Sequence, residues 1–134
     1  MKNSQDRKQI VGDWLQRAQE DEQNITALIR DKNVSPSLVC FISQQMAEKY
    51  LKALLLFCSG DYPRIHDLTR LGILIEEHIK EAKELKESFT VLNSYYIGTR
   101  YATDFPEGFT WNMAEEAFGA AEKIKEFVIQ EIVF

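Results

Sequence analysis

The sequence predicts an all-α protein, an up-and-down bundle of four to five helices, and three observations lead to this fold class. Apolar residues recur at helical spacing in five separate segments. No segment shows the period-two alternation of a half-buried strand. One stretch, Leu38–Cys58, is apolar in nearly every direction when wound as a helix, so it should lie at the centre of the bundle. A length of 134 residues suits a single domain, here residues 1–134.

The first helix is expected from about Asp6 to Arg30, with the central helix directly after it. Apolar positions of the first helix are Val11, Trp14, Leu15, Ala18, Ile25, Leu28 and Ile29. Ser35-Pro36 is a start signal for the central helix, because proline in the first turn loses no intrahelical hydrogen bond. Gly60 predicts that this helix ends near Ser59, since glycine readily adopts the left-handed conformation of a helix end.

Three further helices should complete the bundle. Asp67 is the expected N-cap of a short third helix with the inward positions Leu68, Leu71, Leu74, Ile75 and Ile79. A fourth helix is predicted from about Glu81 to Ile97, with one face formed by Ala82, Leu85, Phe89, Leu92 and Tyr96. Residues 102–110 have the composition of a loop. A fifth helix is expected over Trp111–Ile132, and its alanines allow close approach to another helix.

The central helix carries one polar stripe. Its members are Gln45, Glu48, Lys49 and Lys52, which fall within about 100° of one another around the helix axis. Leu38 and Phe41 precede the stripe and Leu56 follows it, so the polar groups lie partway along an otherwise apolar helix. We therefore expect polar groups from other segments to meet them.

Composition and motifs exclude several classes of protein. The formal net charge of −5 argues against general attraction to nucleic acid. Cys40 and Cys58 should not form a disulfide, because 18 residues of helix separate them by about 27 Å. The sequence shows no signal peptide, no membrane-spanning run, no phosphate-binding glycine loop and no metal-ligand spacing. We therefore expect a cytoplasmic protein with no membrane association, no metal and no bound cofactor.

Two interpretations of the remaining polar residues stay open. If the bundle gathers the stripe with two further clusters, Arg64/His66/Asp67 and Tyr95/Arg100/Tyr101, the cations form a phosphate site and the tyrosines offer faces for a base. Alternatively these groups stabilise the fold: Glu48 pairs with Lys52, Lys49 extends to solvent, His66 satisfies a helix end, and Arg100 pairs with Glu48 or Asp67. His66 is also a weak candidate for a general base.

Four motifs in combination resemble those of a known family, the HEPN domain. They are Trp14-(x3)-Ala18-(x2)-Asp21, Gln44-Gln45-Met46-Ala47-Glu48-Lys49-(x2)-Lys52-Ala53-Leu54, His66-Asp67-Leu68 and Arg100-Tyr101. The resemblance spans nearly the whole chain and implies a helical bundle that forms homodimers. It also implies a frequent partnership with a small nucleotidyltransferase encoded alongside, as in a toxin–antitoxin pair.

Some members of that family are metal-independent ribonucleases with an arginine followed after four to six residues by a histidine. Arg100 lacks this histidine, because positions 105–107 hold Phe105, Pro106 and Glu107. The resemblance therefore implies a noncatalytic protein that binds a nucleotide or a nucleotidyltransferase. In this hypothesis the phosphate contacts come from four cations, Lys49, Lys52, Arg64 and Arg100. A base stacks on Tyr95 or Tyr101. The structural polar network consists of Gln45, Glu48 and Asp67. The alternatives are a degenerate ribonuclease that acts on RNA through His66, and a module that binds another protein.

Overall fold

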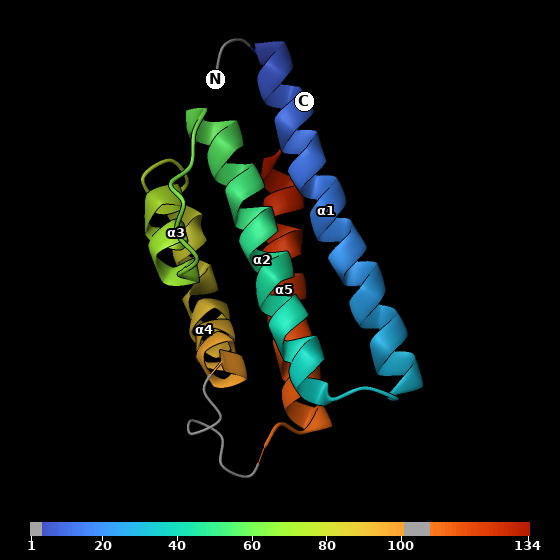
Figure 1. Cartoon of the computed structure of the whole chain (residues 1–134). Helices are drawn as coiled ribbons and strands as arrows, with labels where there is room; N and C mark the ends of the chain where they lie inside the picture. Colours follow the sequence, from blue (N-terminus) through green and yellow to red (C-terminus); the bar gives the residue numbers. More distant parts are fainter. Residues whose placement is uncertain (1–3, 101–107) are drawn as a thin grey trace.

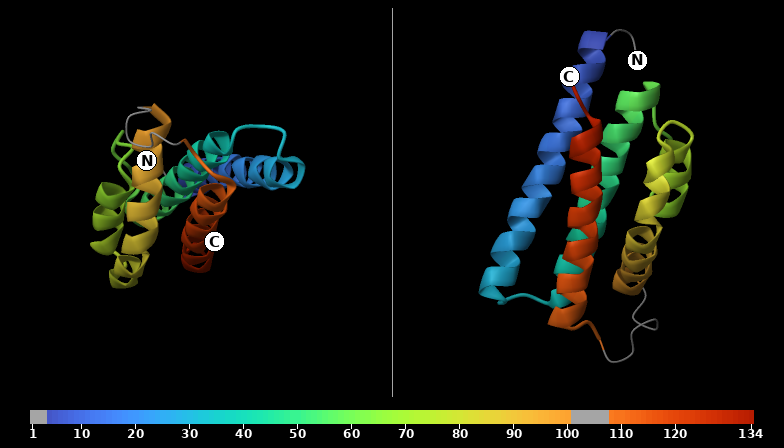
Figure 2. Two further views of the ribbon diagram at one scale, coloured as in Figure 1. Left: turned by 90° about the horizontal axis from the view of Figure 1, so that it is seen from below. Right: turned by 180° about the vertical axis from the view of Figure 1, so that it is seen from behind.

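The fold is all-helical, as the sequence predicts. The computed structural model describes residues 4–100 and 108–134, with the side chains of residues 96–100 left out, and this part contains no strand (Figure 1). The α-helices are α1 (Ser4–Asp31), α2 (Pro36–Ser59), α3 (Leu68–Glu76), α4 (Lys86–Arg100) and α5 (Trp111–Glu131), and a 3₁₀ segment, η1 (Lys80–Leu85), lies between α3 and α4. The long helices run side by side, with neighbours in the chain roughly antiparallel (Figures 1 and 2).

Helix α2 is the centre of the bundle, and it contacts each of the other four α-helices. The view down the bundle shows α1, α5 and the α3–α4 pair arranged around it (Figure 2). The hydroxyl of Ser35 accepts a hydrogen bond from the backbone N–H of Ser37 and so caps the start of α2. Gly60 ends the helix with a φ of 84°. The central position and both ends of the predicted helix are therefore confirmed.

The alanines of α5 lie in the interface between α5 and α2. Ala114, Ala117, Ala120 and Ala121 are all buried, and α5 packs against α2. Alanine has little bulk above the helix backbone, so the two helices approach closely. The expected close approach is confirmed, and this face of α5 is not left open for a second copy of the chain.

The third and fourth helices differ from the prediction. Helix α3 ends at Glu76, and the segment expected to open the fourth helix forms η1 instead. Ala82 and Leu85 are both buried, and this spacing of three matches the three residues per turn of a 3₁₀ helix. Helix α3 also lies close to α4 at Gly72, where an added Cβ would come within 2.2 Å of the Phe89 ring. Glycine is therefore required for this approach.

Two further expectations concern cysteines and membranes. Cys40 and Cys58 are free thiols, as predicted. Burial raises the pKa of the Cys40 thiol to about 12, so it stays protonated at neutral pH. Across residues 4–100 and 108–134, none of the helices combines the length and hydropathy needed to cross a bilayer.

Candidate functional site

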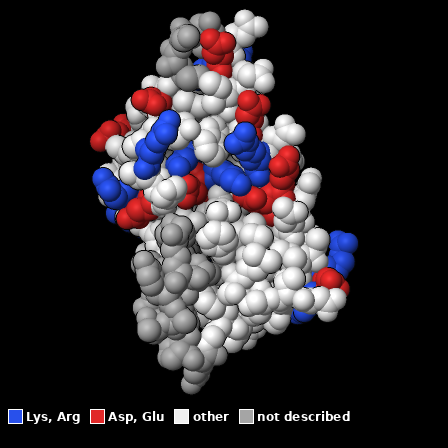
Figure 3. All heavy atoms as spheres, in the orientation of Figure 1, with Lys and Arg blue, Asp and Glu red and all other residues white. Residues whose placement is uncertain are grey.

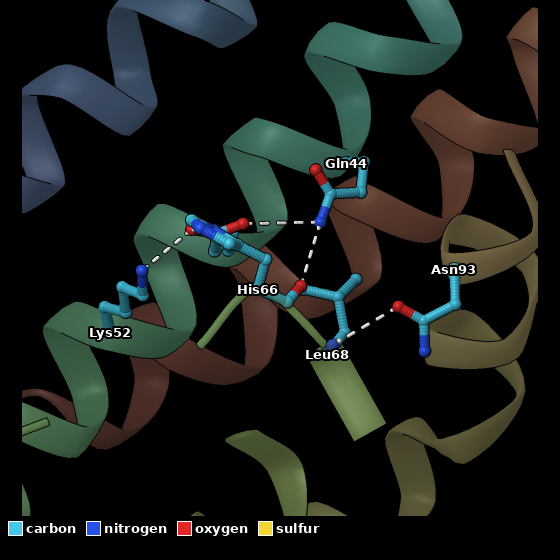
Figure 4. Close-up of polar contacts among 6 residues, drawn as sticks. Gln44, Lys52, His66, Leu68 and Asn93 are labelled. Carbon is cyan, nitrogen blue, oxygen red and sulfur yellow. Dashed lines mark hydrogen bonds and ion pairs between the residues drawn. The ribbon is translucent and has the colours of Figure 1, made fainter. Parts of the chain in front are cut away.

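The carboxylate of Glu48, midway along α2, is where the polar contacts of the site converge. Its Oε2 atom lies 2.8 Å from Lys52 Nζ and 2.9 Å from His66 Nδ1. Its Oε1 atom lies 3.4 Å from Gln44 Nε2 (Figure 4). Only 13% of the Glu48 side chain is exposed, so these donors replace much of the water that the charge would otherwise bind. The predicted pairing of Glu48 with Lys52 is confirmed.

His66 belongs to the segment that joins α2 to α3, and it is held to α2 twice. Gln44 Nε2 donates to the His66 carbonyl oxygen at 3.2 Å, while the imidazole Nδ1 faces the Glu48 carboxylate (Figure 4). Because an ionised carboxylate only accepts hydrogen bonds, Nδ1 carries the hydrogen in this contact. The side chain is nevertheless 64% exposed. The imidazole is thus fixed at one nitrogen while much of its ring meets solvent.

The residues after His66 are anchored to α4. Asp67 accepts a hydrogen bond from Thr69 N at 2.9 Å and is the N-cap of α3, as predicted. Asn93 of α4 accepts from Leu68 N at 3.2 Å (Figure 4). It also donates to Asp67 Oδ1 at 3.1 Å. Asn93 is not among the predicted site residues, although its position four residues after buried Phe89 places it on the inner face of its helix.

Lys52 lies inside the bundle. Its side chain is 7% exposed, and its ammonium pairs with Glu48. The ammonium also lies 5.9 Å from the centre of the Trp14 ring and 5.6 Å from that of Tyr62. The two rings meet edge to face at 5.4 Å. The phosphate contact expected of Lys52 does not fit this enclosed position, which makes Lys52 part of the polar network around Glu48.

Lys49 joins α2 to α1. Its Nζ lies 2.7 Å from Asp21 Oδ2, and its side chain is 26% exposed. One more ion pair of this kind, Lys125 with Glu22 at 2.8 Å, ties α5 to α1. Asp21 and Glu22, which interrupt the apolar face of the first helix in the sequence, are therefore the partners of lysines on two other helices.

The other predicted residues are dispersed. Gln45 is half-buried, and within the described residues Gln44, not Gln45, makes the hydrogen bonds to the network because it lies on the side of α2 that meets the His66 segment. Arg64 is exposed. Arg100 ends α4, its side chain is outside the described part, and Tyr101 lies wholly outside the described residues. No group of three or more metal-ligating side chains occurs in the described ranges.

Tyr95 occupies the core. It is 5% exposed, its hydroxyl lies 3.1 Å from Glu116 Oε1, and its ring lies 6.4 Å from that of Phe109. Burial, with the hydrogen bond to Glu116, raises the pKa of the Tyr95 hydroxyl to about 12. A ring in this position has no free face for a base, so the predicted stacking role of Tyr95 is replaced by a structural one.

The comparison with protein families covers nearly all of the helical bundle. The HEPN domain family matches residues 11–132, which include most of α1, all of α2 and α5, and the His66-Asp67-Leu68 segment. No curated protein matches the chain. Because the family match covers nearly all of the sequence, this chain belongs to the HEPN domain family.

Proposed function

We propose that this HEPN protein is a noncatalytic nucleotide-binding module whose phosphate site is the surface around His66. The observation that carries the proposal is the 64% exposed imidazole held at 2.9 Å from Glu48. In its protonated form the ring donates from both nitrogens, so one can remain with Glu48 while the other meets a phosphate oxygen. Glu48 then stabilises the positive charge of the ring.

Two cations support a phosphate at this surface. Arg64 is exposed and lies two residues before His66, and no ion pair within the described residues engages it. Lys49 lies one residue after Glu48 and keeps 26% of its side chain exposed, and its ammonium would contact a phosphate while it also pairs with Asp21 at 2.7 Å. A guanidinium can bind two phosphate oxygens at once, so Arg64 should make the main contact with the phosphate.

A titration with ATP followed by calorimetry tests the proposal. Saturable binding is expected for the wild type, and about tenfold weaker binding for Arg64→Ala and His66→Ala, the loss typical of one charge-assisted hydrogen bond. Lys83→Ala is the matched control, because it removes one exposed positive charge on η1. Absence of saturable binding by the wild type, with ATP and with the other nucleoside triphosphates, contradicts the proposal.

A second candidate function is metal-independent RNA cleavage through His66, and the Glu48–His66 contact favours it. A carboxylate at Nδ1 fixes the ring with Nε2 as the free nitrogen, which is the arrangement of a general base. Cleavage of labelled RNA in the presence of EDTA should then disappear in His66→Ala. A wild-type protein that leaves varied RNAs intact excludes this alternative and keeps the noncatalytic one.

We also propose that the chain forms a homodimer through the N-terminal half of α2. Residues 36–46 contain no charged side chain, and the part of the front face over this half shows no Lys, Arg, Asp or Glu (Figure 3). Leu38 is 39% exposed there. Sedimentation equilibrium should show a wild-type dimer and a Leu38→Glu monomer. A monomeric wild type at micromolar concentration contradicts this proposal.

A small nucleotidyltransferase is the protein partner we propose, on the strength of the family membership. In this arrangement the HEPN chain is one component of a toxin–antitoxin-like pair. Co-expression with a nucleotidyltransferase encoded by a neighbouring gene should yield one complex in gel filtration. Separate elution of the two proteins at micromolar concentration argues against the pair.

A further inference from the structure

Helix α3 carries an exposed aliphatic side chain, Ile73, on the side opposite its buried face. Its buried positions are Leu68, Leu71, Gly72 and Ile75. The opposite side of the helix is a stripe about 100° wide, formed by Arg70, Ile73, Leu74 and the C-cap residue Glu77. Ile73 is 54% exposed. Leu74 is half-buried and packs against the core, so Ile73 is the large aliphatic side chain that this stripe presents to solvent, where a surface helix normally carries polar residues.

Two adjoining cavities follow the outer stripe. One, of about 390 Å³, lies between the end of α2 and α3, and its wall includes Tyr62, Pro63, Leu74, Glu77 and His78. The other, of about 400 Å³, is lined by Pro63, Ile65, Arg70, Ile73 and Leu74. Pro63 and Leu74 line both cavities, so the two adjoin, and we name the pair the α3 groove. Helix α3 lies at the outside of the bundle (Figure 1), and the groove residues Arg70, Ile73 and Glu77 are exposed.

The α3 groove has opposite charges at its two ends. Arg70 lines one cavity, and Asp61 and Glu77 line the other. Arg70 and Glu77 are seven residues apart, about 10 Å along the helix axis. None of these three side chains takes part in an ion pair within residues 4–95 and 108–134. The groove therefore offers an apolar floor along two helical turns, with the Arg70 cation at one end and the Glu77 and Asp61 carboxylates at the other. Asp61 also accepts a hydrogen bond from Tyr62 N at 2.8 Å.

We propose that the α3 groove binds an amphipathic helix of a partner protein. Apolar side chains at positions i+3 and i+4 of that helix cover Ile73, Leu74 and Pro63, which is the usual pattern for a helix in a groove. An acidic side chain at one end of the same face meets Arg70, and a basic one two turns away meets Asp61 and Glu77. The separation of the charges matches the i to i+7 distance of a helix, so charge complementarity selects this partner and fixes its direction.

Synthetic helical peptides test the proposal by fluorescence anisotropy. The mixed-charge peptide carries Glu, Leu, Leu and Lys at i, i+3, i+4 and i+7, and is made in both sequence orders; a second peptide has Lys at both charged positions. The wild type should bind one order of the mixed-charge peptide at least fivefold more tightly than the dilysine peptide. Arg70→Glu should reverse that preference, and Ile73→Glu should bind neither peptide.

Controls separate this proposal from the others. Lys83→Glu changes an exposed charge outside the groove and should keep the wild-type preference, while circular dichroism checks the fold of every variant. Ile73→Glu should retain ATP binding. Lack of saturable binding to either mixed-charge peptide, or a preference that Arg70→Glu leaves unchanged, overturns the proposal. So does a wild-type dimer that Ile73→Glu, but not Leu38→Glu, dissociates, because a second copy then fills the groove.

Discussion

At the scale of single residues, Glu48 is the side chain around which the polar contacts of the site are arranged. It contacts Lys52 and His66 through one oxygen and Gln44 through the other. The side chains of Glu48 and Lys52 are 13% and 7% exposed, so both charges have lost most of their water. Each charge is tolerated in this position because the other is beside it.

Removal of the Glu48 carboxylate should therefore destabilise the fold. We expect Glu48→Ala to lower the free energy of unfolding by about 3 kcal/mol, since an unpaired ammonium stays inside the bundle. Urea unfolding followed by circular dichroism measures this change. The double variant Glu48→Ala/Lys52→Met should recover part of the loss, because no buried charge remains. A single variant as stable as the wild type contradicts this account of the pair.

At the scale of elements, the segment between α2 and α3 is fastened at both of its sides. Gln44 and Glu48 hold His66 from α2, and Asn93 holds Leu68 and Asp67 from α4. The short helix α3 is thus positioned by polar contacts at its start as well as by its buried leucines. The position of His66 depends on two other helices.

Loss of the contact from α4 should loosen the start of α3. In Asn93→Ala the Leu68 N–H loses its acceptor, and we expect its hydrogen exchange to become at least tenfold faster, the change given by about 1.4 kcal/mol. Amide exchange followed by NMR measures this rate. Exchange at Ile124 in α5, which is buried and remote in sequence, should stay unchanged. Equal acceleration at both amides indicates general destabilisation and contradicts a local role.

Features set by residues close together in the sequence could be predicted, and features set by contacts between distant residues could not. Ser35, Pro36 and Gly60 act on their own neighbours, so the ends of α2 were predicted correctly. The contacts of Gln44 with His66 and of Leu68 with Asn93 join residues 22 and 25 positions apart, and periodicity carries no information about such pairs. The 3₁₀ segment was missed because its i, i+3 apolar spacing also fits an α-helix. Lys52 was expected to contact phosphate because its aromatic neighbours, which enclose it, lie in other segments.

At the scale of the whole molecule, charge is unevenly distributed. Lys and Arg gather with Asp and Glu across the upper part of the front face, while the region over the N-terminal half of α2 shows none of them (Figure 3).

Two tyrosine hydroxyls are buried in the fold, and their burial affects the stability of the whole molecule. Burial raises the pKa of both Tyr50 and Tyr95 to about 12. In the unfolded chain these hydroxyls ionise near their ordinary pKa, about 10.

Stability should accordingly fall at alkaline pH. A group whose pKa is raised by folding stabilises the native state below its unfolded pKa, and this contribution is lost as the pH rises toward the folded value. We expect the urea midpoint to be constant between pH 7 and 8 and to fall from about pH 9 to 12, because the Cys40 thiol, whose pKa burial also raises from 9.0 to about 12, adds to the effect of the two tyrosines. Tyr95→Phe should show a shallower fall, with tyrosine ionisation followed at 295 nm. A midpoint that does not change up to pH 12 contradicts the effect of burial on these tyrosines.

The two-sided attachment of His66 has a thermodynamic consequence for whatever ligand meets its ring. The backbone and one ring nitrogen are already in place, so binding costs little conformational entropy at this residue. Affinity should depend mainly on how slowly the ligand leaves, and not on a rearrangement that precedes its arrival. Free and ligand-bound protein should then give nearly the same backbone chemical shifts for residues 64–69, with changes confined to the imidazole and the exposed cations beside it.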